Sequence, residues 1–260
     1  MKITVFTSNQ PRHLRLIERL AGIADQVMVV HNVNTLFPGR VPGFYRKSEV
    51  MQDYFTRVIA AEAAVFGRPR FLPANVRVLS LYSADVNLLE RDVLEPALSA
   101  DVFVVFGSAY IKPPLVDWLI ERGCLNIHMG LSPWYRGSSC NFWALYDGHP
   151  EMVGATIHRL SRGLDSGAML CHAVPAPQPV DGFLLGMLAV RAAHDKLTDL
   201  IASGRWRDIT PVPQDRALQI RYTRSADFND EVAADYLRRL STPEWIEAAL
   251  AAADRSQLLV

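Results

Sequence analysis

Residues 102–106, VFVVF, are apolar at every position. A strand with one face in water alternates apolar and polar residues, so an unbroken apolar run is typical of a strand buried on both faces of a parallel sheet. Other strand-like runs lie at residues 3–6, 27–30, 76–81 and 125–128. Helix-like segments separate them at residues 12–20, 88–98 and 114–122. This alternation predicts an α/β fold with a mostly parallel sheet covered by helices.

The chain has 260 residues, of which 50% are hydrophobic, so it can bury a full core. We expect a main domain over residues 1–205, which ends in a long helix at 182–203, and a small C-terminal extension over 206–260 with an amphipathic stretch at 231–240. An insertion at about residues 31–67 interrupts the alternation. Its second half, EVMQDYFTRVIAAEAAVFG, is strongly helical and could cover the sheet or line a substrate pocket.

The formal net charge is zero, which removes the electrostatic argument for a nucleic-acid or membrane-surface partner. The sequence contains neither a signal-peptide pattern nor an apolar run long enough to span a bilayer. We therefore expect a cytoplasmic protein that acts on a small molecule. The three cysteines, Cys124, Cys140 and Cys171, have no CxxC spacing, so we expect them to be buried and reduced, and we expect no metal site.

Polar residues gather where the predicted strands end. In an open parallel sheet, ligands bind beyond the carboxyl ends of the strands. Asn126 and His128 lie two residues apart in the strand at 125–128, so their side chains point to the same side of the sheet. A Gly-flanked loop after the next strand-like segment carries Asp165 toward the same crevice. We expect these three side chains to act on one ligand.

Three pieces of this sequence together resemble the formyltransferase superfamily: Asn126-Ile-His128, the LSPWYRG run at residues 131–137, and Leu164-Asp165-Ser166-Gly167. They occur in the family's order and spacing within roughly residues 75–175. The superfamily includes glycinamide ribonucleotide transformylase, methionyl-tRNA formyltransferase and the nucleotide-sugar N-formyltransferases. The resemblance implies a Rossmann-like catalytic domain, 10-formyltetrahydrofolate as the formyl donor and an amine as the acceptor.

The chemistry of formyl transfer suits the three polar residues. An amine attacks the formyl carbon, negative charge builds on the formyl oxygen, and the attacking nitrogen loses a proton. The Asn126 amide can donate a hydrogen bond to the oxyanion. His128 can accept the amine proton or, when protonated, support the same oxyanion. Asp165 would orient and charge-stabilise His128 and could hold the water that relays the proton. None of these steps needs a metal.

The resemblance also implies which residues hold the two substrates. The walls around the pterin ring of the donor would be Gly107, Ser108, Ala109, Tyr110, Ile111, Lys112, Leu160, Ser161, Gly163 and Leu164. Candidate acceptor-binding residues are Ser8, Asn9, Arg12, Met129, Gly130 and Arg136, with Tyr222 and Arg224 as weaker ones. Met129 and Gly130 stand where most family members carry proline and serine. The other histidines, His158 and His13 among them, lack partners at informative spacing and are interpreted as structural or solvated.

The acceptor is less constrained than the reaction. No glycine lies in the segment at 8–13, where the transformylase with a phosphoribosyl substrate has a Gly-rich phosphate loop, which argues against that acceptor. The neutral charge and short extension argue against tRNA. We expect a nucleotide-linked amino sugar of the kind used in O-antigen or other lipopolysaccharide and glycan biosynthesis, and a homodimer. Two alternatives stay open: a formyltetrahydrofolate hydrolase, and a folate-binding protein that keeps the fold without the reaction.

Overall fold

The computed structural model describes residues 1–41, 48–82 and 84–259. Within these residues the main sheet has seven strands in the order β3-β2-β1-β4-β5-β7-β8. Their bounds are β1 (Lys2–Ser8), β2 (Gln26–Val33), β3 (Val76–Tyr82), β4 (Val102–Phe106), β5 (Leu125–His128), β7 (Ala155–Arg159) and β8 (Met169–Ala173). Strands β1 to β5 pair in parallel, whereas β7 and β8 are antiparallel to their neighbours. The predicted α/β fold with a mostly parallel sheet is confirmed.

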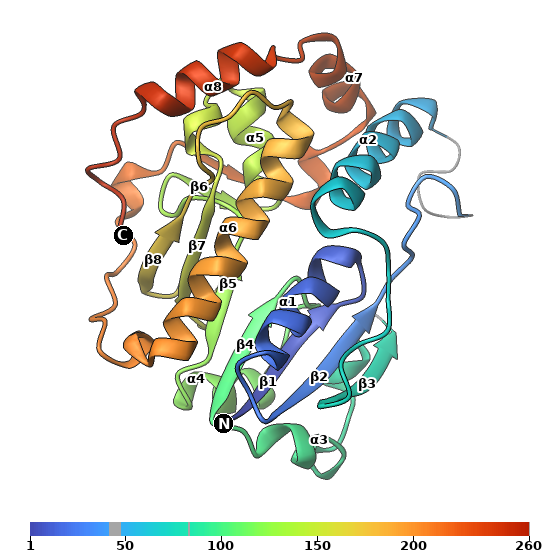
Figure 1. Cartoon of the computed structure of the whole chain (residues 1–260), viewed down its shortest axis with the longest axis vertical. Helices are drawn as coiled ribbons and strands as arrows, with labels where there is room; N and C mark the ends of the chain where they lie inside the picture. Colours follow the sequence, from blue (N-terminus) through green and yellow to red (C-terminus); the bar gives the residue numbers. More distant parts are fainter. Residues whose placement is uncertain (42–47, 83, 260) are drawn as a thin grey trace.

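Helices cover both faces of this sheet. The helices of the described residues are α1 (Pro11–Ala21), α2 (Glu49–Phe66), α3 (Arg91–Leu98), α4 (Leu115–Glu121), α5 (Cys140–Tyr146), α6 (Gly182–Ser203), α7 (Asp230–Arg238) and α8 (Pro243–Ala252). In Figure 1, α1 and α6 lie across one face of the sheet, and α3 and α4 lie on the opposite face. The helix expected from residue 88 begins at Arg91, because the extended backbone of Glu90 precedes it and a 3-10 turn occupies Asp85–Asn87.

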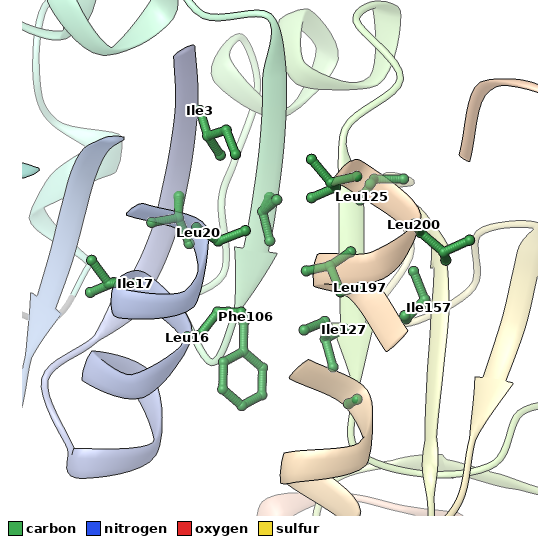
Figure 2. Packing of buried hydrophobic residues seen from close by; sticks show 14 of the residues in the cluster. Ile3, Leu16, Ile17, Leu20, Phe106, Leu125, Ile127, Ile157, Leu197 and Leu200 are labelled. Atoms are coloured by element: carbon green, nitrogen blue, oxygen red, sulfur yellow. The ribbon is translucent and has the colours of Figure 1, made fainter. Parts of the chain in front are cut away.

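Alternate residues of the central strands supply the two cores. Val104 packs in the cluster on the α1 and α6 side, whereas its neighbours Phe103 and Val105 pack on the α3 and α4 side. Figure 2 shows Leu16 and Leu20 of α1 and Leu197 of α6 meeting strand residues from the first side. Full burial of such a side chain contributes about 1.5–3 kcal/mol. The two cores together therefore hold the strands rigidly, including their carboxyl ends.

The helical half of the insertion forms α2, and it packs on other helices. Its first turn begins where the Ser48 side chain accepts a hydrogen bond from the Met51 amide (3.1 Å). It lies against α1, α6 and α7, and Tyr54 makes ring contacts with Phe142 and Phe228. Residues 42–47 of the insertion lie outside the described residues. Helix α2 therefore packs mainly on α1, α6 and α7.

The residues after 205 pack closely on the main sheet domain. Strand β6 (Tyr135–Gly137) pairs in parallel with β9 (Arg221–Thr223) in a separate two-stranded sheet. Tyr236, Ile246 and Leu250 of α7 and α8 are buried with the aromatic residues of α5. Figure 1 shows α7 and α8 grouped with α5 at one end of the molecule. The boundary at residue 205 stays a prediction.

Two smaller findings complete the fold. All three cysteines are free and buried, as predicted. Among the described residues, no helix has the length and apolar character needed to cross a bilayer.

Candidate active site

A cleft of about 460 Å³ lies at the carboxyl ends of β1, β4 and β5. Its volume falls within the range of roughly 300–1,000 Å³ that is usual for small-molecule sites. Asn126 and His128 of β5 both line it, as their shared side of the strand predicts. Because the sheet is buried on both faces, the two side chains emerge from a rigid support, and both are almost fully buried themselves.

Asp165 meets both of these residues. Its Oδ2 lies 3.1 Å from Nδ1 of His128, and its Oδ1 accepts a hydrogen bond of 3.1 Å from Nδ2 of Asn126. The Asp165 backbone has φ 45°, in the left-handed region that few residues other than Gly, Asn and Asp adopt. Gln214 supports this conformation because its Nε2 donates to the backbone oxygens of Asp165 (2.8 Å) and Gly167 (2.9 Å). The structure thus brings the three predicted residues into direct contact.

The contact between His128 and Asp165 is an ion pair. Burial acts to lower the pKa of His128, but the Asp165 carboxylate and the nearby Cys140 outweigh it and raise this pKa well above the ordinary value. Burial also acts to raise the pKa of Asp165, but the charge on His128 holds it well below the ordinary value. At neutral pH the pair is therefore an imidazolium and a carboxylate.

His158, interpreted from sequence as structural or solvated, belongs to this cluster. It lies opposite Asn126 in the antiparallel pairing of β5 with β7 and lines the cleft. Its Nδ1 lies 2.7 Å from the carbonyl oxygen of Arg159, which can only accept, so Nδ1 carries the proton in the neutral ring. Its Nε2 then accepts from Nδ2 of Asn126 at 2.9 Å. His158 and Asp165 together fix the orientation of the Asn126 amide.

Most of the predicted donor-binding residues line the same cleft. These are Gly107, Ser108, Ala109, Tyr110, Ile111, Leu160, Ser161, Gly163 and Leu164. Lys112 does not line it, and its backbone amide instead donates to Oδ1 of Asn87 (2.7 Å). The two segments that contain these residues follow β4 and β7, and the Tyr110 hydroxyl of the first donates to the backbone oxygen of Arg162 in the second at 2.7 Å.

Some of the predicted acceptor-binding residues also line the cleft. Ser8, Arg12 and Met129 do, together with His13, which was interpreted as structural or solvated, and Asn34, which sequence reasoning did not single out. Arg12 is held by Glu62 of α2 through a 2.8 Å contact between Nη1 and Oε1. The insertion thus reaches the site in two ways, directly through Asn34 and through the contact of Glu62 with Arg12.

Three other predicted residues are used elsewhere. The Asn9 amide is tied to the backbone of Asn34, and Asn9 does not line the cleft. Gly130 lies beside His128, where an added Cβ would stand 2.7 Å from Nε2 of that histidine and 2.5 Å from Cβ of Cys140. Arg136 lines a second cleft, which also contains Tyr222. Within the described part of the chain, no group of three or more His, Cys, Asp or Glu side chains is placed to hold a metal ion.

Comparison with known proteins extends these observations. The family model described as "Formyl transferase" matches residues 1–179, which include Asn126, His128 and Asp165. Methionyl-tRNA formyltransferase of Synechococcus sp. (strain JA-3-3Ab) is 34% identical over 135 residues, which cover 51% of this chain and 42% of the relative. The match thus spans less than half the length of that curated relative.

Solved structures with the same fold cover more of the chain. The formyltransferase PseJ from Anoxybacillus kamchatkensis, in complex with UDP-4,6-dideoxy-4-formamido-L-AltNAc and tetrahydrofolate, superposes with a TM-score of 0.51 at 15% identity, covering 96% of this chain and 100% of that one. A 4-N formyltransferase from Francisella tularensis gives 0.54 at 18% identity, covering 95% and 85%. Glycinamide ribonucleotide transformylase 1 from Symbiobacterium toebii gives 0.51 at 21%, covering 79% and 89%. At these identities the likeness concerns the fold.

Proposed function

This chain belongs to the formyl transferase family, and we propose that it transfers a formyl group from 10-formyltetrahydrofolate to the amine of a nucleotide-linked sugar. The observation that carries this proposal is the double contact of Asp165 with His128 and Asn126 at the edge of the cleft. Residues from two separate strand ends meet there around a space that a carbonyl group can enter.

The cleft suits the pterin end of the donor. Phe106, Ile111 and Leu160 give it apolar walls, and the backbone of residues 107–111 and 160–164 supplies polar groups along two sides. A flat heterocycle with polar edges needs this combination of apolar surface and hydrogen-bonding main chain. When bound, the donor supplies the activated formyl carbon.

The ionic state of His128 bears on the role that sequence left open. Because Asp165 raises the pKa of His128, the protonated ring is favoured, and an imidazolium donates hydrogen bonds. This argues against removal of the amine proton by His128. Because Nδ1 faces Asp165 and Nε2 lies 3.4 Å from the carbonyl oxygen of Tyr135, the ring supports the developing oxyanion through its positive charge. Asn126 supplies a second donor when one Nδ2 hydrogen turns from Asp165 or His158 to the oxygen. In other enzymes one such donor contributes about 2.7–4 kcal/mol.

The proton of the attacking amine needs an acceptor. Asp165 is ionised and lies at the cleft wall, so its carboxylate can accept a hydrogen bond from a water that takes the amine proton and passes it to solvent. The same carboxylate holds His128 in place, which couples the orientation of the imidazolium to the relay.

Two lines of support concern the acceptor. The fold of PseJ, whose structure contains a UDP-linked formamido sugar, matches along the whole of that chain. The zero net charge of the present chain provides no general attraction for a polyanion such as tRNA. A second candidate is methionyl-tRNA, which is supported by the names of the sequence relatives. A cytoplasmic location and a homodimer stay predictions.

A turnover assay distinguishes these acceptors. Purified protein is given 10-formyltetrahydrofolate with a panel of dTDP-, GDP- and UDP-amino sugars, and in a separate reaction with methionyl-tRNA. We expect a formylated sugar and its loss in Asn126→Ala, because the oxyanion donor is removed. Formylation of methionyl-tRNA with a silent sugar panel would refute the sugar acceptor. Formate release without any amine would favour the hydrolase, and folate binding without turnover would favour the non-enzymatic alternative.

A further inference from the structure

The small β6 and β9 sheet places two arginines in opposite electrostatic situations. Tyr135 pairs with Arg221, and Arg136 pairs with Tyr222. Successive side chains of a strand point to opposite faces, so Tyr135 and Arg221 share one face of the sheet, and Arg136 and Tyr222 share the other. The pairing is close, since a Cβ on Gly137 would lie 1.9 Å from the carbonyl oxygen of Thr223.

On the first face the charge is fully matched. Arg221 donates from Nε and Nη2 to the Asp147 carboxylate at 2.7 Å and 2.6 Å, and the Tyr135 hydroxyl lies 3.2 Å from the same carboxylate. This bidentate pair is a complete internal arrangement and leaves no need for a ligand.

On the second face the charge is unmatched. Arg136 is only 8% exposed, and its Nη1 donates to the neutral Oε1 of Gln219 at 3.3 Å. Its Nε is buried and has no hydrogen-bond partner, and no salt bridge to Arg136 occurs among the described residues. A buried cation without a counter-charge costs several kcal/mol, so this arrangement is understandable if an anion completes it.

Arg136 faces a cleft of about 480 Å³, here called the arginine cleft. Its lining adds a second arginine, Arg216, and three neutral donors, Ser166, Gln219 and Tyr222, and the described lining contains no aspartate or glutamate. Gly163 and Leu164 line both this cleft and the folate-sized one, and they directly precede Asp165. The arginine cleft therefore borders the catalytic loop.

We propose that the arginine cleft binds an anionic group, a phosphate or carboxylate, of one of the two substrates. The Nε edge of Arg136 matches the geometry that both anions use in bidentate pairs, with Arg216 adding charge at the cleft mouth. This inference rests on the proposed function, which offers two sources: the diphosphate of a nucleotide-linked acceptor, and the glutamate tail of the folate donor.

Binding measurements without turnover test the inference. Calorimetry is used to measure the affinity of the whole chain for inorganic pyrophosphate, for folinic acid with one glutamate, and for its pentaglutamate. The variants are Arg216→Gln, Arg136→Lys and Arg136→Gln, and Arg68→Gln removes an exposed charge outside the cleft as the matched control. A hydrogen bond to a charged group contributes about 1.5–3 kcal/mol, so Arg136→Gln should lower the affinity for the anion by about 10–100-fold. Arg136→Lys should weaken it less, because lysine keeps the charge without the fork.

The outcomes separate the two sources. If the Arg136 and Arg216 variants bind pyrophosphate more weakly than the wild type but bind monoglutamate folinic acid equally well, the cleft is assigned to the diphosphate of the acceptor. A loss confined to the pentaglutamate assigns it to the donor tail. The proposal is overturned if the wild type neither binds pyrophosphate nor prefers the pentaglutamate, or if Arg68→Gln causes the same losses. If Arg136→Gln does not fold, the affinities of Arg216→Gln, which changes an exposed residue, and of Arg136→Lys test the proposal instead. None of these binding measurements requires formyl transfer. If the protein binds anions in this cleft but shows no turnover with any acceptor, only the proposed function is refuted.

Discussion

Replacing Asp165 by asparagine tests the ionic state of the His128–Asp165 pair. The change keeps the shape of the side chain and removes its charge, which lies 3.1 Å from Nδ1 of His128. The two side chains are 5% and 16% exposed, and at an effective dielectric constant of about 20 their attraction is about 5 kcal/mol. Without it, burial is the largest remaining influence, so the pKa of His128 should fall from well above its ordinary value to below it.

Nuclear magnetic resonance of protein labelled at histidine measures this change, with the His128 signal assigned from a His128→Gln variant. In the wild type the ring should still be protonated at a pH well above about 6.5, the ordinary histidine pKa. In Asp165→Asn it should be neutral at pH 7. Asp117→Asn, which removes the half-buried partner of the exposed Arg162, should leave the signal unchanged. The reasoning is refuted if His128 titrates at its ordinary value in the wild type, or at the same pH in both proteins.

The same variant should lose turnover. In other enzymes, the loss of an aspartate that orients a catalytic histidine lowers kcat by about 10⁴-fold. A comparable fall is expected with Asp165→Asn, measured with whichever acceptor the panel identifies. Retention of a tenth or more of the wild-type rate would show that Asp165 is not needed for either orientation or relay.

Three further predictions concern stability. The raised folded-state pKa of His128 gives stability that is fully present below about pH 6.5 and is lost as the pH rises through that raised value. The lowered pKa of Asp165 gives stability that is present above about pH 3.9 and is lost as the pH falls through the lowered value. The free energies of unfolding in urea of wild type and Asp165→Asn should therefore differ most between about pH 3.9 and pH 6.5. A difference that stays constant across pH would contradict the ion pair between His128 and Asp165. Gly130→Ala should cost about 1–3 kcal/mol, because the new methyl group overlaps Nε2 of His128 and Cβ of Cys140, and an unchanged urea midpoint would show that the site can relax. Tyr54→Ala should lower the free energy of unfolding by about 3 kcal/mol by removing a ring that packs between helices, whereas Tyr54→Phe should be nearly neutral.

Periodicity predicted the parts of the fold whose pattern is local. The strand at 102–106 and the helix at 182–203 have the predicted bounds in the structure, because continuous burial and helical spacing are both visible within one segment. Helix α8 was not predicted. It buries only Ile246 and Leu250 and is otherwise rich in alanine, so its apolar pattern has little contrast. Strands β6 and β9 have three residues each and depend on pairing between distant parts of the chain.

The site divides in the same way. Asn126 and His128 were predictable because one strand carries both. Asp165 was placed at the same crevice by the Gly-flanked loop that follows the next strand-like segment, and the resemblance to a known family supported that placement. His158 was missed because its contact with Asn126 depends on the pairing register of β5 and β7, which no local pattern reveals. The unmatched charge of Arg136 could not be predicted either, because sequence alone does not show that Asp147 pairs with Arg221 and leaves Arg136 without a carboxylate.

The positive φ of Asp165 limits how this site can vary. Glutamate, the usual charge-conserving replacement, has a longer side chain and also a backbone that enters the left-handed region less readily than aspartate. Asparagine tolerates the backbone but abolishes the charge. Neither glutamate nor asparagine therefore preserves both the backbone conformation of the loop and its charge as well as aspartate does, which restricts variation at this position.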